Sequence, residues 1–185
     1  MHEFDQLFPA LTPTELAEIL AMWDEPHRRW HGRKHLVDLL DILALHPKLD
    51  EADVEMLRYV ALFHDAVYAP LRSDNEEESA KLAAKYLAKY SRRDEVIEAI
   101  LATKKHESEY PLAQLFNSWD CAILHETNWK KLVAYEEDIA FEYRDVERET
   151  YRRERSRFLR KAAQDHANPS LMRLADEVEN GCSTH

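Results

Sequence analysis

Residues 60–68 read Val-Ala-Leu-Phe-His-Asp-Ala-Val-Tyr, an apolar run that ends in the adjacent ionisable residues His64 and Asp65. Ionisable side chains in a mostly buried segment need partners, because a buried polar or charged group without one is costly. A divalent cation satisfies an imidazole and a carboxylate at the same time. The run therefore predicts a helix that leads from the core of the protein to a metal site.

The sequence around this run favours helices. Only two residues are glycine, while Leu, Ala, Glu, Lys and Arg, which have high helix propensity, are abundant. Thr12-Pro13-Thr14-Glu15 has the pattern of a capping box with proline at the first helical position. Asp50 and Asp53 can cap the helix that carries residues 54–64. We therefore predict an all-α protein.

Further helices are predicted from apolar residues at helical spacing. They cover residues 36–43, a segment that begins between 74 and 78 and reaches 87, a segment capped by Ser91, and residues 111–123. Residues 128–167 contain neither glycine nor proline, so either one very long helix or two in sequence are possible, with Phe158 among the inward positions. A chain of 185 residues favours one domain, so we expect a single-domain helical bundle over 1–185, with the helical region of about 128–178 packed on the core.

Composition limits the partners of the protein. The net charge of −11 makes a long nucleic acid an unlikely partner, although local positive charge could hold a single nucleotide. Cys121 and Cys182 are too few for a disulfide framework. The N-terminus lacks the pattern of a signal peptide, and no segment is apolar for long enough to span a bilayer. We expect a soluble cytoplasmic protein without a membrane partner.

Two further residues, His35 and Asp120, are candidate ligands because each lies on an otherwise hydrophobic predicted helix. Two imidazoles and two carboxylates suit Mn²⁺, Mg²⁺, Co²⁺, Ni²⁺ or Fe²⁺. Taken singly, His64 could be a hydrogen-bonded core histidine, and Asp65 a helix-end carboxylate paired with an arginine. Their adjacency inside an apolar run favours the metal site.

The order His35, His64-Asp65, Asp120 resembles that of the HD superfamily of metal-dependent phosphohydrolases. The resemblance covers most of the chain, and it is specific for a bacterial subgroup of predicted HD phosphohydrolases. The similar segments are Arg29-Trp30-His31 with His35, Phe63 to Tyr68, Asp74 to Ala80, and Thr103-Lys104-Lys105-His106, with Asp120 at the position of the last metal ligand. The chain departs from the subgroup where Trp30 replaces a usual Tyr and Ala140 replaces a common Arg, although Arg155 stands at the place of a later one.

The resemblance implies an HD-type bundle in which His35, His64, Asp65 and Asp120 hold one divalent metal ion, with a second metal possible. It also implies a metal-dependent phosphohydrolase that attacks a phosphate ester of a small molecule, such as a nucleotide, with metal-activated water.

Asp65, Glu76 and His106 are the candidate catalytic residues. Glu76 could accept a proton, or it could belong to a capping box over residues 73–76. His106 could bind phosphate, protonate the leaving oxygen or hold a second metal, or it could only complement a helix end.

His31, Arg33 and Lys34 are candidate substrate-binding residues. On a continuous helix His31 would share a face with His35, whereas Arg33 and Lys34 could equally be solvated surface charges. Two alternatives to the hydrolase remain: an HD-fold di-iron oxygenase and a metal-binding regulatory module with little catalysis. Apolar residues of the last helical region could serve a homodimer as well as a core.

Overall fold

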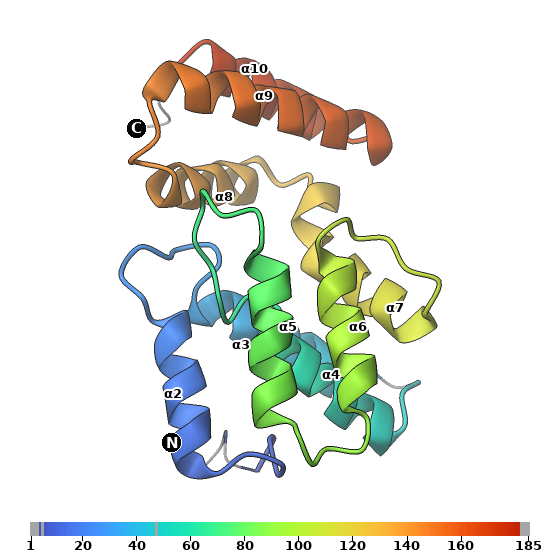
Figure 1. Cartoon of the computed structure of the whole chain (residues 1–185). Helices are drawn as coiled ribbons and strands as arrows, with labels where there is room; N and C mark the ends of the chain where they lie inside the picture. The colour runs from blue at the N-terminus through green and yellow to red at the C-terminus, as the bar shows by residue number, and fades with distance from the viewer. Residues whose placement is uncertain (1–3, 5, 47, 182–185) are drawn as a thin grey trace. The chain divides into compact units, whose positions relative to one another are not determined.

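The structure is a computed structural model that describes residues 4, 6–46 and 48–181 (Figure 1). Every regular element within these residues is a helix and no strand occurs among them, which confirms the all-α prediction. The α-helices are α2 (Pro13–Trp23), α3 (Arg33–Ala44), α4 (Glu51–Phe63), α5 (Asn75–Tyr86), α6 (Arg93–Thr103), α7 (Pro111–Asp120), α8 (Trp129–Glu142), α9 (Arg148–Asp165) and α10 (Pro169–Glu179), and η1 (Ala122–His125) is a short 3-10 helix. None of the helices in the described ranges has the length and apolar character needed to cross a membrane. Cys182 lies outside the described residues.

Two helix starts follow from local capping chemistry. Thr12 Oγ1 accepts a hydrogen bond from the Glu15 N–H, and the Glu15 carboxylate accepts one from the Thr12 N–H, so the predicted capping box is confirmed. Asp50 caps α4 by accepting a hydrogen bond from the Asp53 N–H at 2.8 Å. Each cap joins residues only three apart, which explains why sequence alone could find it.

The capping box over residues 73–76, one of the two alternatives for Glu76, does not form. Helix α5 begins at Asn75 with Asp74 as its N-cap, and no side-chain cap hydrogen bond forms there. The Asp74 carboxylate is instead paired with Arg72 at 2.8 Å, and the Glu76 carboxylate lies 3.8 Å from Lys104 Nζ. The carboxylates of Asp74 and Glu76 therefore form ion pairs instead of capping α5.

The cap predicted at Ser91 is wrong, because the N-cap of α6 is Arg92 and has no side-chain cap hydrogen bond. The Arg92 guanidinium holds this end by donating to Asp53 at 2.9 Å and to Glu95 at 2.7 Å. The helix predicted over 111–123 ends at Asp120, and the 3-10 helix η1 follows.

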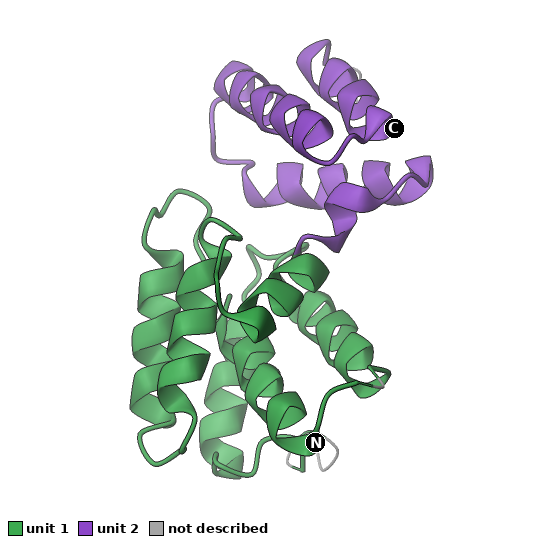
Figure 2. Ribbon diagram, turned by 90° about the vertical axis from the view of Figure 1, so that its right-hand side faces the viewer, with its two compact units in different colours: residues 1–120 green, residues 121–185 purple. Residues whose placement is uncertain are grey.

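The chain divides into two compact units, residues 1–120 and 121–185 (Figure 2). Helix α4 is central in unit 1, where it contacts α3, α5, α6 and α7. Every residue of α4 from Tyr59 to Phe63 is buried, as the apolar run predicts. This burial places the C-terminal end of α4, and with it His64, in the interior of unit 1.

Unit 2 contains η1, α8, α9 and α10, with a small core of its own. The stretch without glycine and proline forms two helices rather than one. The second, α9, has Glu147 as its N-cap, whose carboxylate accepts hydrogen bonds from the backbone N–H groups of Glu149 and Thr150. The inward position predicted for Phe158 is wrong: its side chain is 46% exposed, since the buried stripe of α9 runs through Ser156, Leu159 and Ala163. That the 128–178 region packs on the core of one domain stays a prediction.

Candidate metal centre

His64 lies at the C-terminal end of α4, where its side chain is only 1% exposed. Its Nδ1 is 3.0 Å from the carbonyl oxygen of Ala61. A carbonyl can only accept, so Nδ1 carries the proton of the neutral ring and Nε2 keeps its lone pair. Nε2 is buried and has no hydrogen-bond partner of good geometry. In its neutral form the ring therefore presents Nε2 as a ligand nitrogen inside unit 1.

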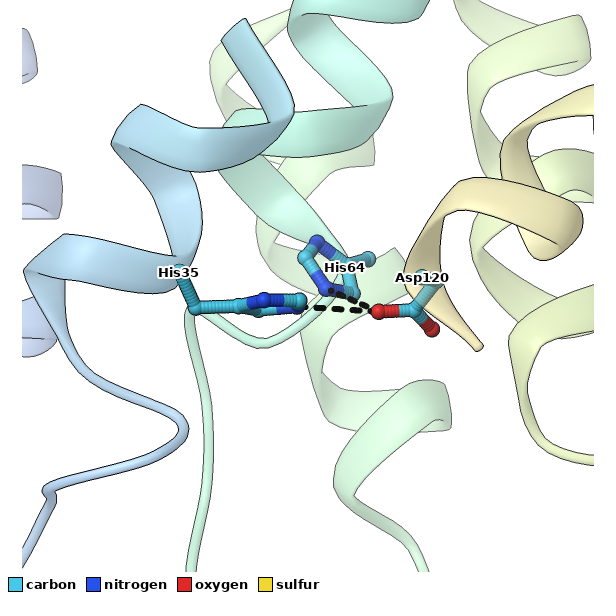
Figure 3. A group of neighbouring side chains, drawn as sticks. All are labelled: His35, His64 and Asp120. Atoms are coloured by element: carbon cyan, nitrogen blue, oxygen red, sulfur yellow. Dashed lines mark hydrogen bonds and ion pairs between the residues drawn. The ribbon is translucent and has the colours of Figure 1, made fainter. Parts of the chain in front are cut away.

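Two other helices bring side chains to this nitrogen (Figure 3). His35 is in the first turn of α3, and Asp120 is the last residue of α7. Asp120 Oδ1 lies 2.9 Å from His35 Nε2 and 3.4 Å from His64 Nε2. The ligand atoms of these three residues all lie within 4.8 Å of one another, so the group could hold a metal ion.

The distances fit a common cation. Ligand atoms that each lie about 2.1 Å from one metal ion are about 3 Å apart when the angle between them is near 90°. The observed separations of 2.9 and 3.4 Å are close to this value. Two imidazoles and a carboxylate form a mixed nitrogen and oxygen set that does not select one divalent metal.

Asp65 lies beside this group. Its Oδ2 is 3.4 Å from His64 Nε2, but the carboxylate does not belong to the set of three whose atoms are all mutually close. The structure thus brings together three of the four predicted ligands, with the fourth in contact with one of them. The arginine next to Asp65, Arg28, binds its backbone carbonyl and not its carboxylate.

His106 contacts the other oxygen of Asp120, with its Nε2 3.1 Å from Oδ2. The residue follows α6 in a left-handed backbone conformation, with φ of 53°. Its imidazole therefore belongs to the cluster through Asp120.

The charges of the cluster shift one another strongly. Burial alone would lower the pKa of His64, but the carboxylates of Asp65 and Asp120 outweigh burial and raise this pKa well above its usual value. Burial raises the pKa of both carboxyl groups, and the positive charge of His64 outweighs it. The pKa of Asp65 falls to about 2, and that of Asp120 falls well below its ordinary range, helped by hydrogen bonds from His106 and His35. The site therefore favours a positive charge, which a divalent cation can supply in place of a proton.

The remaining predicted site residues lie in different places. His31 lies before the start of α3, so it does not share a helix face with His35. The centroid of its ring is 4.3 Å from that of Tyr68, on which it stacks, and 6.4 Å from that of His35. Arg33 is paired with Asp24 and Lys34 with Asp38, and neither has a recorded contact with the cluster. Glu76 has its ion pair with Lys104.

Sequence reasoning missed two residues that support the site. The ring of Trp23 lies 5.6 Å from that of His64, and its Nε1 donates to the Leu62 carbonyl at 2.9 Å. Arg28 is buried and binds the backbone that follows His64. No signal in the sequence distinguishes Arg28 from its neighbour Arg29, because the carbonyls of Asp65 and Ala66 come close to Arg28 only in the folded chain.

The fold and the cluster define a class: an all-α protein with a buried group of two histidines and an aspartate that could hold a metal ion. Comparisons of the chain with family models, with curated proteins and with solved structures found no match.

Proposed function

We propose that unit 1 binds a divalent metal ion through His35, His64 and Asp120, with Asp65 as a fourth ligand. The observation that carries this proposal is the buried Nε2 of His64, which has no hydrogen-bond partner and lies 3.4 Å from Asp120 Oδ1. This nitrogen lies beside two carboxylates, and a cation between the imidazoles and Asp120 would be its partner in place of a proton. Mn²⁺, Mg²⁺, Co²⁺, Ni²⁺ and Fe²⁺ all suit these ligands.

The reaction that we propose is hydrolysis of a phosphate ester of a small molecule, with a nucleotide as the substrate class. The resemblance to the HD superfamily supports this choice of reaction, which the ligand set by itself leaves open. A bound divalent cation would lower the pKa of a coordinated water and polarise a phosphoryl oxygen.

The residues of the chain have distinct parts in this proposal. The Ala61 carbonyl holds the His64 ring in the tautomer that presents Nε2. His106 fixes the orientation of Asp120 and can pass a proton to the leaving oxygen. Glu76 is the second group proposed to move protons, and its carboxylate lies 3.8 Å from Lys104 Nζ.

Metal analysis combined with a nucleotide screen tests the proposal. Wild-type protein should contain about one equivalent of a divalent metal and hydrolyse a nucleotide. Asp65→Ala should lose both while its circular dichroism stays that of the wild type. Asp94→Asn is the matched control, because it removes a carboxylate that is 83% exposed on α6. Full activity in Asp65→Ala, or wild-type protein that takes up no metal from Mn²⁺ or Ni²⁺, would refute the proposal.

One observation favours a second candidate, a dinuclear oxygenase. Asp120 has imidazoles on both carboxylate oxygens, His35 and His64 beside Oδ1 and His106 beside Oδ2, as a carboxylate that bridges two metal ions would require. Two equivalents of iron in the same metal analysis would put this candidate first.

A further inference from the structure

Arg28, in the segment between α2 and α3, has a charged side chain that is only 1% exposed. A guanidinium has five N–H donors, and all five are used here. Nε and Nη2 donate to the Glu25 carboxylate at 3.0 and 2.8 Å, and Nη2 also donates to the Ala66 carbonyl at 2.9 Å. Nη1 donates to the carbonyls of His31 and Asp65 at 3.3 and 2.5 Å. These complete contacts offset the cost of burying the charge.

The carbonyls that Arg28 binds belong to the two segments that present the metal ligands. Asp65 and Ala66 come directly after His64, at the end of α4, where backbone carbonyls have no partner within the helix. His31 comes four residues before His35. One nitrogen, Nη1, thus binds both the backbone that follows His64 and the backbone that precedes His35.

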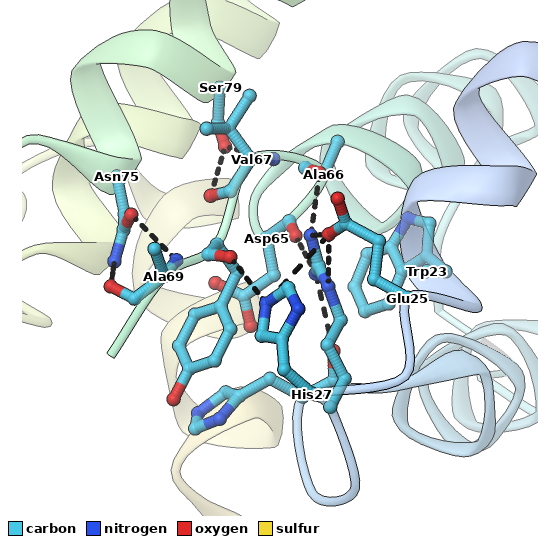
Figure 4. Close-up of polar contacts among 12 residues, drawn as sticks. Trp23, Glu25, His27, Asp65, Ala66, Val67, Ala69, Asn75 and Ser79 are labelled. Carbon is cyan, nitrogen blue, oxygen red and sulfur yellow. Dashed lines mark hydrogen bonds and ion pairs between the residues drawn. The ribbon is translucent and has the colours of Figure 1, made fainter. Parts of the chain in front are cut away.

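Helix α5 holds the next residues of the same segment from the other side (Figure 4). Ser79 Oγ accepts from the Val67 N–H at 3.1 Å and donates to the Val67 carbonyl at 3.3 Å. Asn75 accepts from the Ala69 N–H at 3.1 Å and donates to the Ala69 carbonyl at 3.0 Å. Asn75 and Ser79 are four residues apart and so share one face of α5. The backbone over residues 65–69 is therefore fixed on both sides.

We propose that Arg28 is a positioning residue of the metal centre. Its guanidinium sets the position of the backbone at Asp65 and Ala66, and through it the positions of the His64 ring and the Asp65 carboxylate. This inference rests on the proposed metal site. Lysine would keep the charge but has only three donors and no planar fork, so it cannot bind one carboxylate and three carbonyls at the same time.

The test compares Arg28→Lys with Arg92→Lys. Arg92 is a second multiply bonded arginine of unit 1, with a side chain that is 22% exposed, but its partners Asp53, Glu95 and Tyr110 all lie outside the cluster. The first measurement is hydrogen exchange of the backbone amides over residues 64–69, and the second is the affinity for Mn²⁺ alone, followed by electron paramagnetic resonance. Arg28→Lys should speed exchange in this segment and weaken Mn²⁺ binding at least tenfold, as changes beside metal ligands do. Arg92→Lys should leave both unchanged.

The two measurements separate this inference from the proposed function. Unchanged exchange over 64–69 in Arg28→Lys overturns the positioning role, whatever the metal affinity. Faster exchange with unchanged Mn²⁺ affinity also overturns it, because the segment would then move without affecting the site. Wild-type protein that does not bind Mn²⁺ overturns the proposed function and this inference with it. If Arg28→Lys does not fold, Glu25→Gln removes the charge that pairs with the guanidinium from a partly exposed position, and the same two measurements decide.

Discussion

Manganese should raise the thermal stability of the protein only when the carboxylate of Asp120 is present. Its Oδ1 lies between the Nε2 atoms of His35 and His64, at 2.9 and 3.4 Å. Asp120→Asn keeps the size of the side chain and one oxygen but removes the negative charge. We therefore expect this variant to fold and to lose the metal.

The size of the effect follows from binding linkage. A ligand that binds only the folded state, present at a hundred times its dissociation constant, stabilises that state by about 2.7 kcal/mol. A unit the size of residues 1–120 has an unfolding entropy of about 0.25 kcal/mol per kelvin. The melting temperature of unit 1 should thus rise by about 10 °C in wild-type protein and stay the same in Asp120→Asn.

Scanning calorimetry of metal-free protein with and without Mn²⁺ is the suitable assay, because two compact units can unfold in separate transitions. Asp94→Asn should respond to Mn²⁺ as the wild type does. An equal rise in Asp120→Asn would mean that Mn²⁺ binds elsewhere. No rise in wild-type protein at saturating Mn²⁺ would mean that the cluster is not a metal site.

Three further predictions concern stability and are measured by urea unfolding. Arg92 and Tyr110 lower the pKa of Glu95 from 4.5 to about 2, so ionised Glu95 stabilises the fold above about pH 4.5 and this contribution is lost as the pH falls toward 2. The difference in urea midpoint between wild type and Glu95→Gln should therefore shrink from pH 6 to pH 3. It is small at any pH, because the side chain is 40% exposed and solvent screens its charge. A difference that stays constant with pH would contradict this prediction. Phe116→Ala should cost about 3–5 kcal/mol, because this fully buried ring packs in the core of unit 1; a loss below about 1 kcal/mol would show that the core collapses around the cavity. Asn168→Ala should cost about 3 kcal/mol, because its amide donates to two carbonyls at 3.0 and 2.9 Å and its oxygen caps α10; a neutral result would mean that water replaces these bonds.

The sequence predicted those parts of the fold that depend on near neighbours. The cap of α2 joins Thr12 to Glu15, and the burial of α4 follows from its continuous apolar run. The cap predicted at Ser91 is wrong and the cap considered at Ser73 does not form, because neither residue is the N-cap. Ion pairs with residues outside the helix start hold these ends instead. A propensity pattern contains no information on such competing partners.

The candidate site was predictable in its residue types more than in its geometry. His35 and Asp120 are 85 residues apart, and their placement rested on a carboxylate and an imidazole on apolar helices together with the family resemblance. Arg28 could not be found in this way, because its partners at Asp65 and Ala66 are 37 and 38 residues away and are backbone carbonyls, which every residue has. A residue that is bound only through its backbone carbonyl can have any side chain, so its identity does not predict the contact.

The proposed dication would complement the charges around the cluster. His64 follows the last residue of α4 and Asp120 is the last residue of α7, so two helix C-termini bring partial negative charge to this place. The carboxylates of Asp65 and Asp120 add two full negative charges, and the charge of Arg28 is already paired with Glu25. One proton on His64 balances only half of the carboxylate charge. In the proposed site a divalent cation would balance both carboxylates with the imidazoles neutral, and the hydrogen bond from His64 to Ala61 favours the tautomer that such binding needs.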